Sequence, residues 1–171
     1  MTSSAMQQLY QQIILDHAKS AHGAVADLGE LDALTEGAPA STSVTPDGLR
    51  QAQSHQVNTT CGDEITVRVG LTGAGMDARI DEFAWRGAGC SISMASASVL
   101  NDTVRGTSVT ESTAVLDLFR EMLRSRGTIE PDEEVLGDAA AFAGVSKYPA
   151  RVKCAMLPWV AFEAALLQLR S

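Results

Sequence analysis

The first regular hydrophobic pattern of the chain lies close to its N-terminus. Apolar residues recur there at helical spacing, namely Met6, Leu9, Tyr10, Ile13 and Ile14. This spacing predicts an amphipathic helix, for which Ser3 or Ser4 is the expected cap. His17 continues the apolar face of the same helix, and a single histidine in such a place is more often a packed core residue than a ligand.

The hydrophobic pattern is lost between about residues 20 and 56. Gly, Pro, Ser, Thr and Asp are frequent in this stretch. Because these residues favour turns over regular elements, we expect a long loop with one short helical turn near 28–34. The end of the stretch, about 51–57, is a candidate first strand.

A hairpin with one buried face follows this loop. Apolar residues alternate with polar ones at Ile65, Val67, Val69 and Leu71. Alternation of period two predicts a strand, and the segment TGAGMD then turns the chain. The return strand carries Ile80, Phe83 and Trp85, and its step from Ile80 to Phe83 breaks the alternation. We therefore expect a β-bulge at Asp81 or Glu82.

The second half of the chain predicts mainly helices. The segment Ser91–Val104 is rich in Ser, Ala and Met, which favours a closely packed helix. Ser108 and Glu111 have the spacing of a capping box ahead of the next helix. A short helix is expected at 139–143, and a final helix at 149–169. One helix, a small antiparallel sheet of about three strands and then several helices together predict an α+β fold.

Length, composition and charge narrow the possible functions. A chain of 171 residues suits a single domain over 1–171, and 45% hydrophobic with 20% charged residues is ordinary for a soluble globular protein. A formal net charge of −8 argues against nucleic-acid binding, which needs clustered Lys and Arg. The chain shows neither an apolar run of about 20 residues nor a secretory signal, so we expect no membrane association and a cytoplasmic location.

The three cysteines are the residues most suggestive of chemistry. In a reducing compartment an odd number of cysteines indicates metal binding or catalysis more than a disulfide framework. Cys61 and Asp63 are two residues apart in extended backbone, so both side chains can point to one side. Cys90 follows Gly-Ala-Gly at a predicted helix N-terminus, and Cys154 lies near the start of the final helix. Helix N-termini favour thiolates, and all three cysteines sit at element ends near one edge of the predicted sheet.

These side chains suit a zinc ion. Three thiolates and one carboxylate form a tetrahedral donor set, consisting of Cys61, Asp63, Cys90 and Cys154. Zinc leaves such a set negatively charged, and Arg151 and Lys153 are candidates to balance that charge. The alternative is that the cysteines are buried separately, since free Cys is among the most buried residue types and the spacings match no standard zinc finger.

Three segments of the chain resemble the signature segments of one family. TTCGDEITVRV, RGAGCSISMASAS and GVSKYPARVKCAML occur in this order and resemble the U-type iron–sulfur assembly proteins, which include IscU and the NifU N-terminal domain. The chain is most similar to the SufU branch. The IscU branch typically has a histidine directly before its third cysteine, where this chain has Lys153, and the long insertion containing 109–138 is a SufU trait. The resemblance covers about 6–16 and 57–167.

The resemblance implies a fold, a metal and a partner. The expected fold is IscU/SufU-like, with Zn²⁺ bound by Cys61, Asp63, Cys90 and Cys154. The expected partner is a pyridoxal-phosphate-dependent cysteine desulfurase (SufS-like), which carries a persulfide on its own cysteine. Cys61 is then the sulfur acceptor, freed when the docked partner takes a zinc position, and downstream iron–sulfur assembly scaffold proteins are further partners. Arg151 is a supporting residue for docking or for charge balance; the alternative is a solvated arginine at the helix start.

Three functions remain open at this point. The first is a zinc-dependent sulfurtransferase, an enzyme that relays persulfide sulfur towards cluster assembly. The second is a scaffold that holds a transient [2Fe–2S] cluster, because thiolates and a carboxylate can hold either metal centre. The third is a structural zinc site in an interaction protein. Lys153 in place of the histidine, together with the insertion, favours the first.

Overall fold

The computed structural model describes residues 4–26, 28, 40–44 and 48–170. The elements follow the α+β order that the sequence predicts, and they are α1 (Ser4–Ser20), β1 (Ala40–Val44), β2 (Arg50–Asn58), β3 (Asp63–Thr72), η2 (Gly75–Asp77), β4 (Arg79–Ala88), α2 (Ser91–Val104), α3 (Val109–Arg124), α4 (Glu133–Leu136), η3 (Gly137–Lys147) and α5 (Pro149–Arg170). The helix expected at 139–143 is part of the 3₁₀ helix η3.

The sheet is a simple antiparallel meander in the order β1-β2-β3-β4. The small antiparallel sheet is confirmed, and β1 adds an edge strand to the expected three. The long loop expected at about 20–56 is therefore wrong for 40–44, which is a strand, whereas the candidate first strand at about 51–57 is confirmed as β2. These strands, ASTSV and RQAQSHQVN, are mostly polar, so ladder hydrogen bonds rather than hydrophobic alternation define them. The helical turn expected near 28–34 falls outside the described residues, apart from Leu28.

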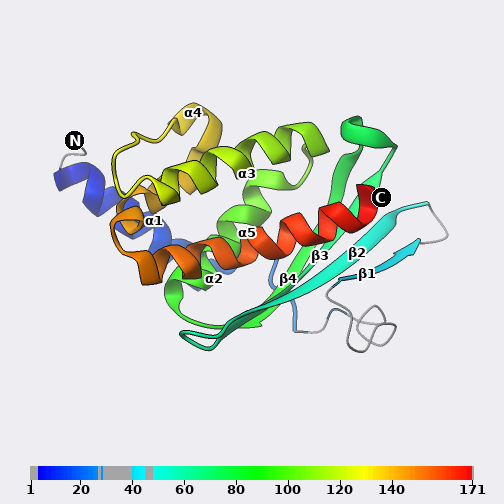
Figure 1. Ribbon diagram of the computed structural model, residues 1–171, viewed down its shortest axis with the longest axis horizontal. Helices are drawn as coiled ribbons and strands as arrows, with labels where there is room; N and C mark the ends of the chain where they lie inside the picture. The colour runs from blue at the N-terminus through cyan, green and yellow to red at the C-terminus, as the bar shows by residue number, and fades with distance from the viewer. Residues whose placement is uncertain (1–3, 27, 29–39, 45–47, 171) are drawn as a thin grey trace.

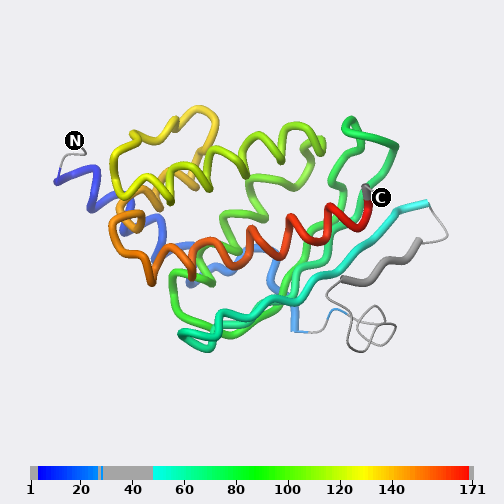
Figure 2. The backbone as a smooth tube through the Cα atoms, in the orientation of Figure 1, coloured from blue at the N-terminus to red at the C-terminus, as the bar shows by residue number. Residues whose placement is uncertain are grey.

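The helices cover one face of the sheet (Figure 1). Helix α5 crosses β2 and β3, and α2 lies between α1 and α5. The apolar positions of the β3–β4 hairpin face this layer, where Phe83 packs against Phe162 with ring centroids 6.0 Å apart. Further along the core, Phe119 stacks on Trp159 at 4.2 Å. The trace in Figure 2 shows that α1 begins at one end of the long axis and that α5 runs towards the other, where β2 extends further.

Two local predictions are confirmed in detail. Gly70 pairs with Glu82 whereas the next residue, Leu71, pairs with Ile80, so Asp81 is the extra residue of a β-bulge. At the start of α3 the Ser108 hydroxyl accepts a hydrogen bond from the Glu111 backbone N–H, and the Glu111 side chain accepts one from the Ser108 N–H. This reciprocal pair is the capping box.

Helix α5 supplies much of the core and one side of the site described below. By length and composition, Pro149–Leu169 is the one stretch of the described residues that passes a test for a membrane-spanning helix. In the fold, 61% of the most apolar part of this helix is buried inside the protein. Such burial is how the central helix of a soluble protein behaves.

Candidate metal centre

The hairpin between β2 and β3 positions Cys61 and Asp63. Asn58 ends β2 and pairs with Asp63, which begins β3, so only four residues close the turn. The backbone N–H of Gly62 donates to the Asn58 carbonyl at 2.8 Å, and Gly62 has φ +78°, a conformation that favours glycine. The turn exposes Cys61 and directs Asp63 into the fold, where its side chain is buried.

The other two cysteines reach the same place from the helical layer. The Cys154 Sγ atom, on α5, lies 3.6 Å from the Cys61 Sγ atom. One donor atom from each of Cys61, Asp63 and Cys154 lies within 4.8 Å of the others. Cys90 directly precedes α2, and its Sγ atom lies 3.5 Å from Asp63 Oδ2. The structure thus gathers all four residues that the sequence singled out, and separate burial of the cysteines is wrong.

The Asp63 carboxylate is the centre of this arrangement. Its Oδ1 atom accepts from the Cys90 backbone N–H at 3.1 Å, and its Oδ2 atom accepts from the Ser93 hydroxyl at 2.6 Å. Burial raises the pKa of this carboxyl, but the hydrogen bonds from Ser93, Cys61, Cys154 and the Cys90 backbone outweigh burial and hold the pKa below its usual value. Asp63 is therefore a fixed anion that is oriented by the first turn of α2.

The three thiols differ in exposure and in electrostatics. Cys61 and Cys90 are exposed, whereas Cys154 is buried. Burial raises the pKa of the Cys154 thiol far above its usual range, and its neighbours Asp63, Cys61 and Cys90 raise it further. Negative charge at this sulfur consequently needs a cation beside it, while Cys61 remains open to a reagent from solution.

Three residues of this site were missed from the sequence. Ser93 is fully buried and donates to Asp63. Asn58 places its Nδ2 atom 4.0 Å from the Cys154 Sγ atom and accepts the Thr60 N–H through its own side chain. At Gly89 a Cβ atom would lie 2.7 Å from Asp63 Oδ1. The position of Ser93, three residues after Cys90 at a helix start, was the available signal.

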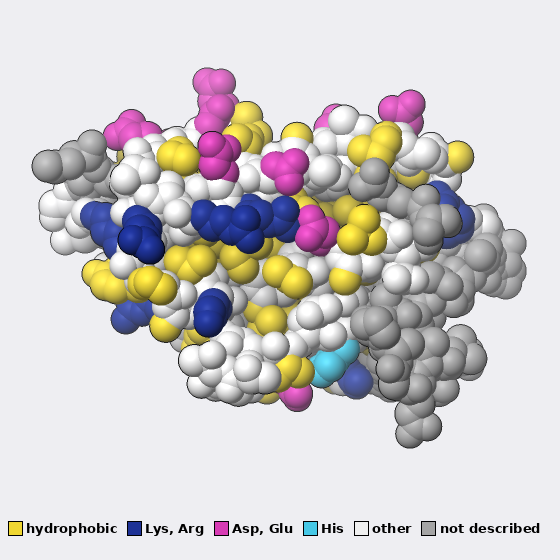
Figure 3. Space-filling view, viewed as in Figure 1, with side chains coloured by type: hydrophobic (Ala, Val, Ile, Leu, Met, Phe, Trp, Pro, Cys, Tyr) yellow, Lys and Arg dark blue, Asp and Glu magenta, His cyan; other side chains and the backbone are white. Residues whose placement is uncertain are grey.

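Arg151 and Lys153 lie at the rim, not among the donors. Both side chains are exposed, and the Arg151 guanidinium lies over the Tyr148 ring, 5.0 Å from its centroid. Balancing the charge of the donors by Arg151 or Lys153 stays a prediction. Figure 3 shows that Lys and Arg side chains form a row across the face at the level of α3 and α5, with hydrophobic side chains beside it. The net acidic charge is therefore unevenly spread over the surface.

The donor set fits a zinc ion. Two sulfurs bound to one tetrahedral zinc at about 2.3 Å are about 3.8 Å apart, close to the 3.6 Å between Cys61 and Cys154. The buried Asp63 is already ionised, and a divalent cation lowers the pKa of a coordinating thiol such as Cys154. Thiolates with one carboxylate suit zinc or an iron–sulfur centre better than Mg²⁺ or Ca²⁺.

The chain is similar to known proteins of one family. Residues 9–155 match the family model described as the NifU-like N terminal domain. The chain is similar to the iron-sulfur cluster assembly scaffold protein IscU of Streptococcus pyogenes serotype M1, with 34% identity over 97% of this chain and 87% of that protein. It is also similar to the zinc-dependent sulfurtransferase SufU of Bacillus subtilis (strain 168), with 33% identity over 91% of this chain and 87% of that protein.

A solved structure has the same fold. It is that of a putative iron-sulfur cluster assembly scaffold protein for the SUF system from Fervidobacterium islandicum AW-1. The match has a TM-score of 0.60 and 28% identity, and it covers 96% of this chain and 99% of that one. Because the family model spans most of the chain and two relatives exceed 30% identity over nearly all of it, this chain belongs to the NifU-like N-terminal domain family, which includes IscU and SufU.

Proposed function

We propose that this protein acts in iron–sulfur cluster assembly as a zinc-dependent sulfurtransferase. It accepts persulfide sulfur from a pyridoxal-phosphate-dependent cysteine desulfurase (SufS-like) and passes it to downstream assembly scaffold proteins. The observation that carries the proposal is the pairing of an exposed Cys61 sulfur with a buried Cys154 sulfur 3.6 Å away, beside an ionised Asp63. This arrangement keeps the Cys61 thiol accessible while the Cys154 sulfur and the Asp63 carboxylate are buried.

Cys61, Asp63, Cys90 and Cys154 would hold the zinc ion. When bound, zinc supplies positive charge that keeps the coordinating sulfurs as thiolates near neutral pH. The chain itself provides the frame: Ser93 and the Cys90 N–H fix the Asp63 carboxylate, and the tight β2–β3 turn presents Cys61 at the surface.

The transfer step is a thiol–disulfide type of exchange. The Cys61 thiolate attacks the outer sulfur of the persulfide on the partner's cysteine, and a new S–S bond forms at Cys61 Sγ. The S–S bond within the partner's persulfide breaks, and its cysteine leaves as a thiolate. The sulfane sulfur changes carrier without net oxidation or reduction, so no further reactant is needed.

Arg151 is proposed as a supporting residue at the rim. Its guanidinium is exposed and lies over Tyr148, itself an exposed aromatic side chain six residues before Cys154. An arginine stacked on an aromatic ring offers a partner both a charge and a flat apolar surface. Its contribution to docking is expected to be modest, because a rim charge mainly changes the association rate.

A scaffold for a [2Fe–2S] cluster is the second candidate function. It is favoured by three thiols around one carboxylate, a set able to hold iron, and one similar protein is named a scaffold. Lys153 is exposed and stands directly before Cys154. A lysine gives iron no imidazole at this position, which favours sulfur transfer over cluster retention.

The test uses the zinc-loaded protein together with its own organism's cysteine desulfurase and free cysteine. We expect a strong increase in sulfide release under reducing conditions, and a mass increase of one sulfur on Cys61 in a single-turnover reaction. Cys61→Ala should bring the rate back to that of the desulfurase alone. Undiminished stimulation by Cys61→Ala would refute the acceptor role. A stable coloured cluster formed from iron and sulfide, without any stimulation, would establish the scaffold function instead.

A further inference from the structure

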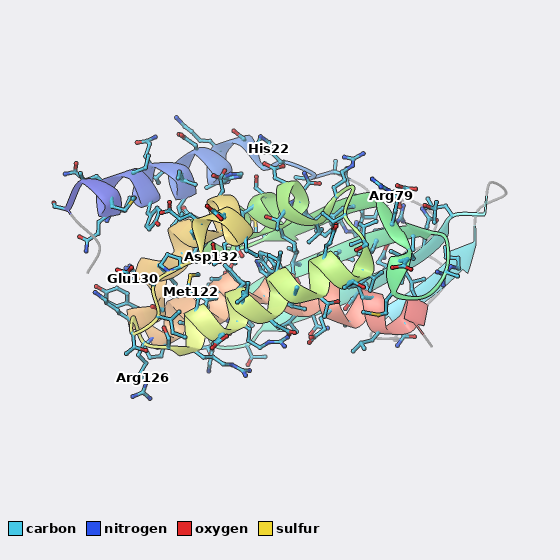
Figure 4. The ribbon with its side chains drawn as sticks, turned by 90° about the horizontal axis from the view of Figure 1, so that it is seen from above. His22, Arg79, Met122, Arg126, Glu130 and Asp132 are labelled. Atoms are coloured by element: carbon cyan, nitrogen blue, oxygen red, sulfur yellow. The ribbon has the colours of Figure 1, made fainter. Side chains whose placement is uncertain are left out.

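A second group of metal-binding side chains lies away from the thiols. His17, His22 and Asp102 each offer one ligand atom, and these atoms all lie within 4.8 Å of one another. We call these three residues the histidine cluster. They come from the last turn of α1, the turn that follows it and the C-terminal part of α2. Figure 4 shows His22 just past the end of α1, next to α2.

Both ring nitrogens of His17 have hydrogen-bond partners, and an ion at Nδ1 would take the place of the Ser98 hydroxyl. The His17 Nε2 atom lies 2.8 Å from Asp138 Oδ2, and its Nδ1 atom lies 2.7 Å from Ser98 Oγ. The Ser98 hydroxyl already accepts the His22 backbone N–H at 2.9 Å, so its own proton is free to point to Nδ1. His17 therefore donates Nε2–H to Asp138 and presents Nδ1 as an acceptor. A carboxylate behind a histidine is the usual support of a metal-binding imidazole.

His22 belongs to a turn that is held from two sides. The indole N–H of Trp85 donates to the His22 carbonyl at 2.8 Å, and the Trp85 backbone N–H donates to the Gly23 carbonyl at 3.0 Å. Gly23 has φ +84°, and a Cβ atom there would lie 2.5 Å from Asn101 Oδ1. The turn is thus fixed against β4 and α2, so His22 is held in place although its side chain is 48% exposed.

Asp102 completes the cluster beside an unpaired polar atom. Its Oδ2 atom lies 2.7 Å from His22 Nδ1, and its Oδ1 atom accepts from Asn101 Nδ2 at 3.0 Å. Asn101 is 7% exposed, and within the described part of the chain its Oδ1 atom has no hydrogen-bond partner. Buried acceptors are normally satisfied, and this one lies close to Gly23, next to His22, where a bound water beside the cluster would pair with it.

From these contacts we propose that the histidine cluster binds a divalent transition-metal ion such as Zn²⁺, separately from the thiol site. Two imidazoles and one carboxylate are the donors that such ions prefer. Donors at about 2.1 Å from one tetrahedral ion are about 3.4 Å apart, so side-chain movements on the order of 1 Å bring the three ligand atoms, now within 4.8 Å of one another, to one ion. Three protein ligands leave a position open to solvent, on the exposed side of His22 and Asp102.

The proposal goes beyond sulfur transfer and does not depend on it. An ion held by His17, His22 and Asp102 joins α1, its following turn and α2. Because an ion that binds only the folded chain favours folding, the melting temperature should rise with free metal concentration even when the thiol site is already filled.

The chain provides its own control for the test. It contains three histidines, and the third, His55 on β2, is 49% exposed, hydrogen-bonded to Thr66 and not part of the cluster. The zinc-loaded protein is dialysed against a graded series of free Zn²⁺, the bound metal is counted, and the ¹⁵N signals of the histidine rings are recorded. We expect a second zinc per chain, with shifts at His17 and His22 and none at His55.

Two partly exposed residues allow the site to be removed without emptying the core. His22→Ala and Asp102→Asn should each weaken the second zinc at least tenfold, whereas His55→Ala should leave it unchanged. Sulfide release with the desulfurase should be unaffected by all three variants, so failure of the sulfurtransferase function would be seen separately. The proposal is overturned if no second zinc binds, or if its affinity is the same in wild type and His22→Ala.

Discussion

The two ends of α2 carry two different polar clusters. At its N-terminal end Cys90 and Ser93 contact the buried carboxylate of Asp63, among thiols. Towards its C-terminal end, Ser98 and Asp102 contact imidazoles. The same helix therefore has a thiol at its N-terminal end and a carboxylate beside two imidazoles near its C-terminal end, with a run of fully buried small residues in between.

The roles of the two carboxylates differ, and this difference determines how each cluster responds to change. Asp63 is 4% exposed and collects hydrogen bonds from within the chain. The Asp102 side chain is 41% exposed and shares its charge with one histidine. Loss of the first leaves buried donors unpaired, whereas loss of the second is compensated by water.

Replacing Asp63 should have the largest effect of any single change in either cluster. Asp63→Ala leaves the Ser93 hydroxyl and the Cys90 N–H without their acceptor, which should cost about 3 kcal/mol of the free energy of unfolding. Bound zinc and stimulation of the desulfurase should be lost together. Urea unfolding and metal analysis measure this, with Glu64→Ala, at the exposed neighbouring carboxylate, as the control. Full zinc content in Asp63→Ala would show that the thiols alone form the site.

Two glycine variants test whether the close packing around Asp63 matters for zinc binding. In Gly89→Ala the new Cβ atom meets Asp63 Oδ1 at 2.7 Å, whereas in Gly144→Ala it meets nothing within 4 Å. We expect zinc affinity to fall about tenfold in the first variant, within the range for residues that position ligands, and to be unchanged in the second. Competition with a coloured chelator gives both affinities. Equal affinities would mean that the carboxylate moves freely.

Two serines on α2 separate the clusters from each other. Ser93→Ala removes a hydrogen bond to Asp63, and Ser98→Ala removes one to His17; each should cost about 1 kcal/mol of stability. The first should weaken zinc at the thiols and leave the histidine ring signals as they are. Ser98→Ala should change the histidine ring signals and leave zinc binding at the thiols as it is. Mixed effects would indicate that the clusters are coupled through the helix.

An effect of similar size on stability, but with none on metal binding, is expected outside both clusters, at the contact between α1 and α4. The Tyr10 hydroxyl donates to Glu133, and burial together with this carboxylate raises the pKa of Tyr10 to about 12. Because the neutral form is favoured in the folded state, the stabilisation is fully present below pH 10 and is lost as the pH rises to about 12. Tyr10→Phe should therefore lower stability by about 1 kcal/mol at pH 8, with the difference from wild type shrinking above pH 10. A constant difference up to pH 12 would contradict this assignment.

Much of the fold could be predicted from local sequence because local rules and packing agree there. The range of α2, the Ser108 capping box and the bulge at Asp81 all depend on neighbouring residues. β1 could not be predicted in this way, because its residues ASTSV become a strand only through pairing with β2. The pairing is local, from Val44 with Arg50 to Ala40 with Ser54, but these mostly polar segments lack the hydrophobic alternation by which a strand is predicted.

The sites show the same limit. The convergence of Cys61, Asp63, Cys90 and Cys154 could be anticipated because each stands at an element end and the motifs resemble a known family. The histidine cluster could not, since His17 fits a core pattern and is in fact buried, while Asp102 reads as a polar residue near a helix end. Only the packing of α1 on α2 brings Ser98 and Asp102 to the histidines.

The hydrogen bonds that Asp63 accepts from Ser93 and from the backbone at Cys90 have a consequence for the loss and return of zinc. Both hydrogen bonds are made by the polypeptide itself, so the Asp63 carboxylate keeps its orientation when a chelator removes the metal. Zinc can then bind again by diffusion alone. For the proposed sulfurtransferase, a cell starved of zinc would then keep folded protein that regains its activity when the metal returns, without new synthesis.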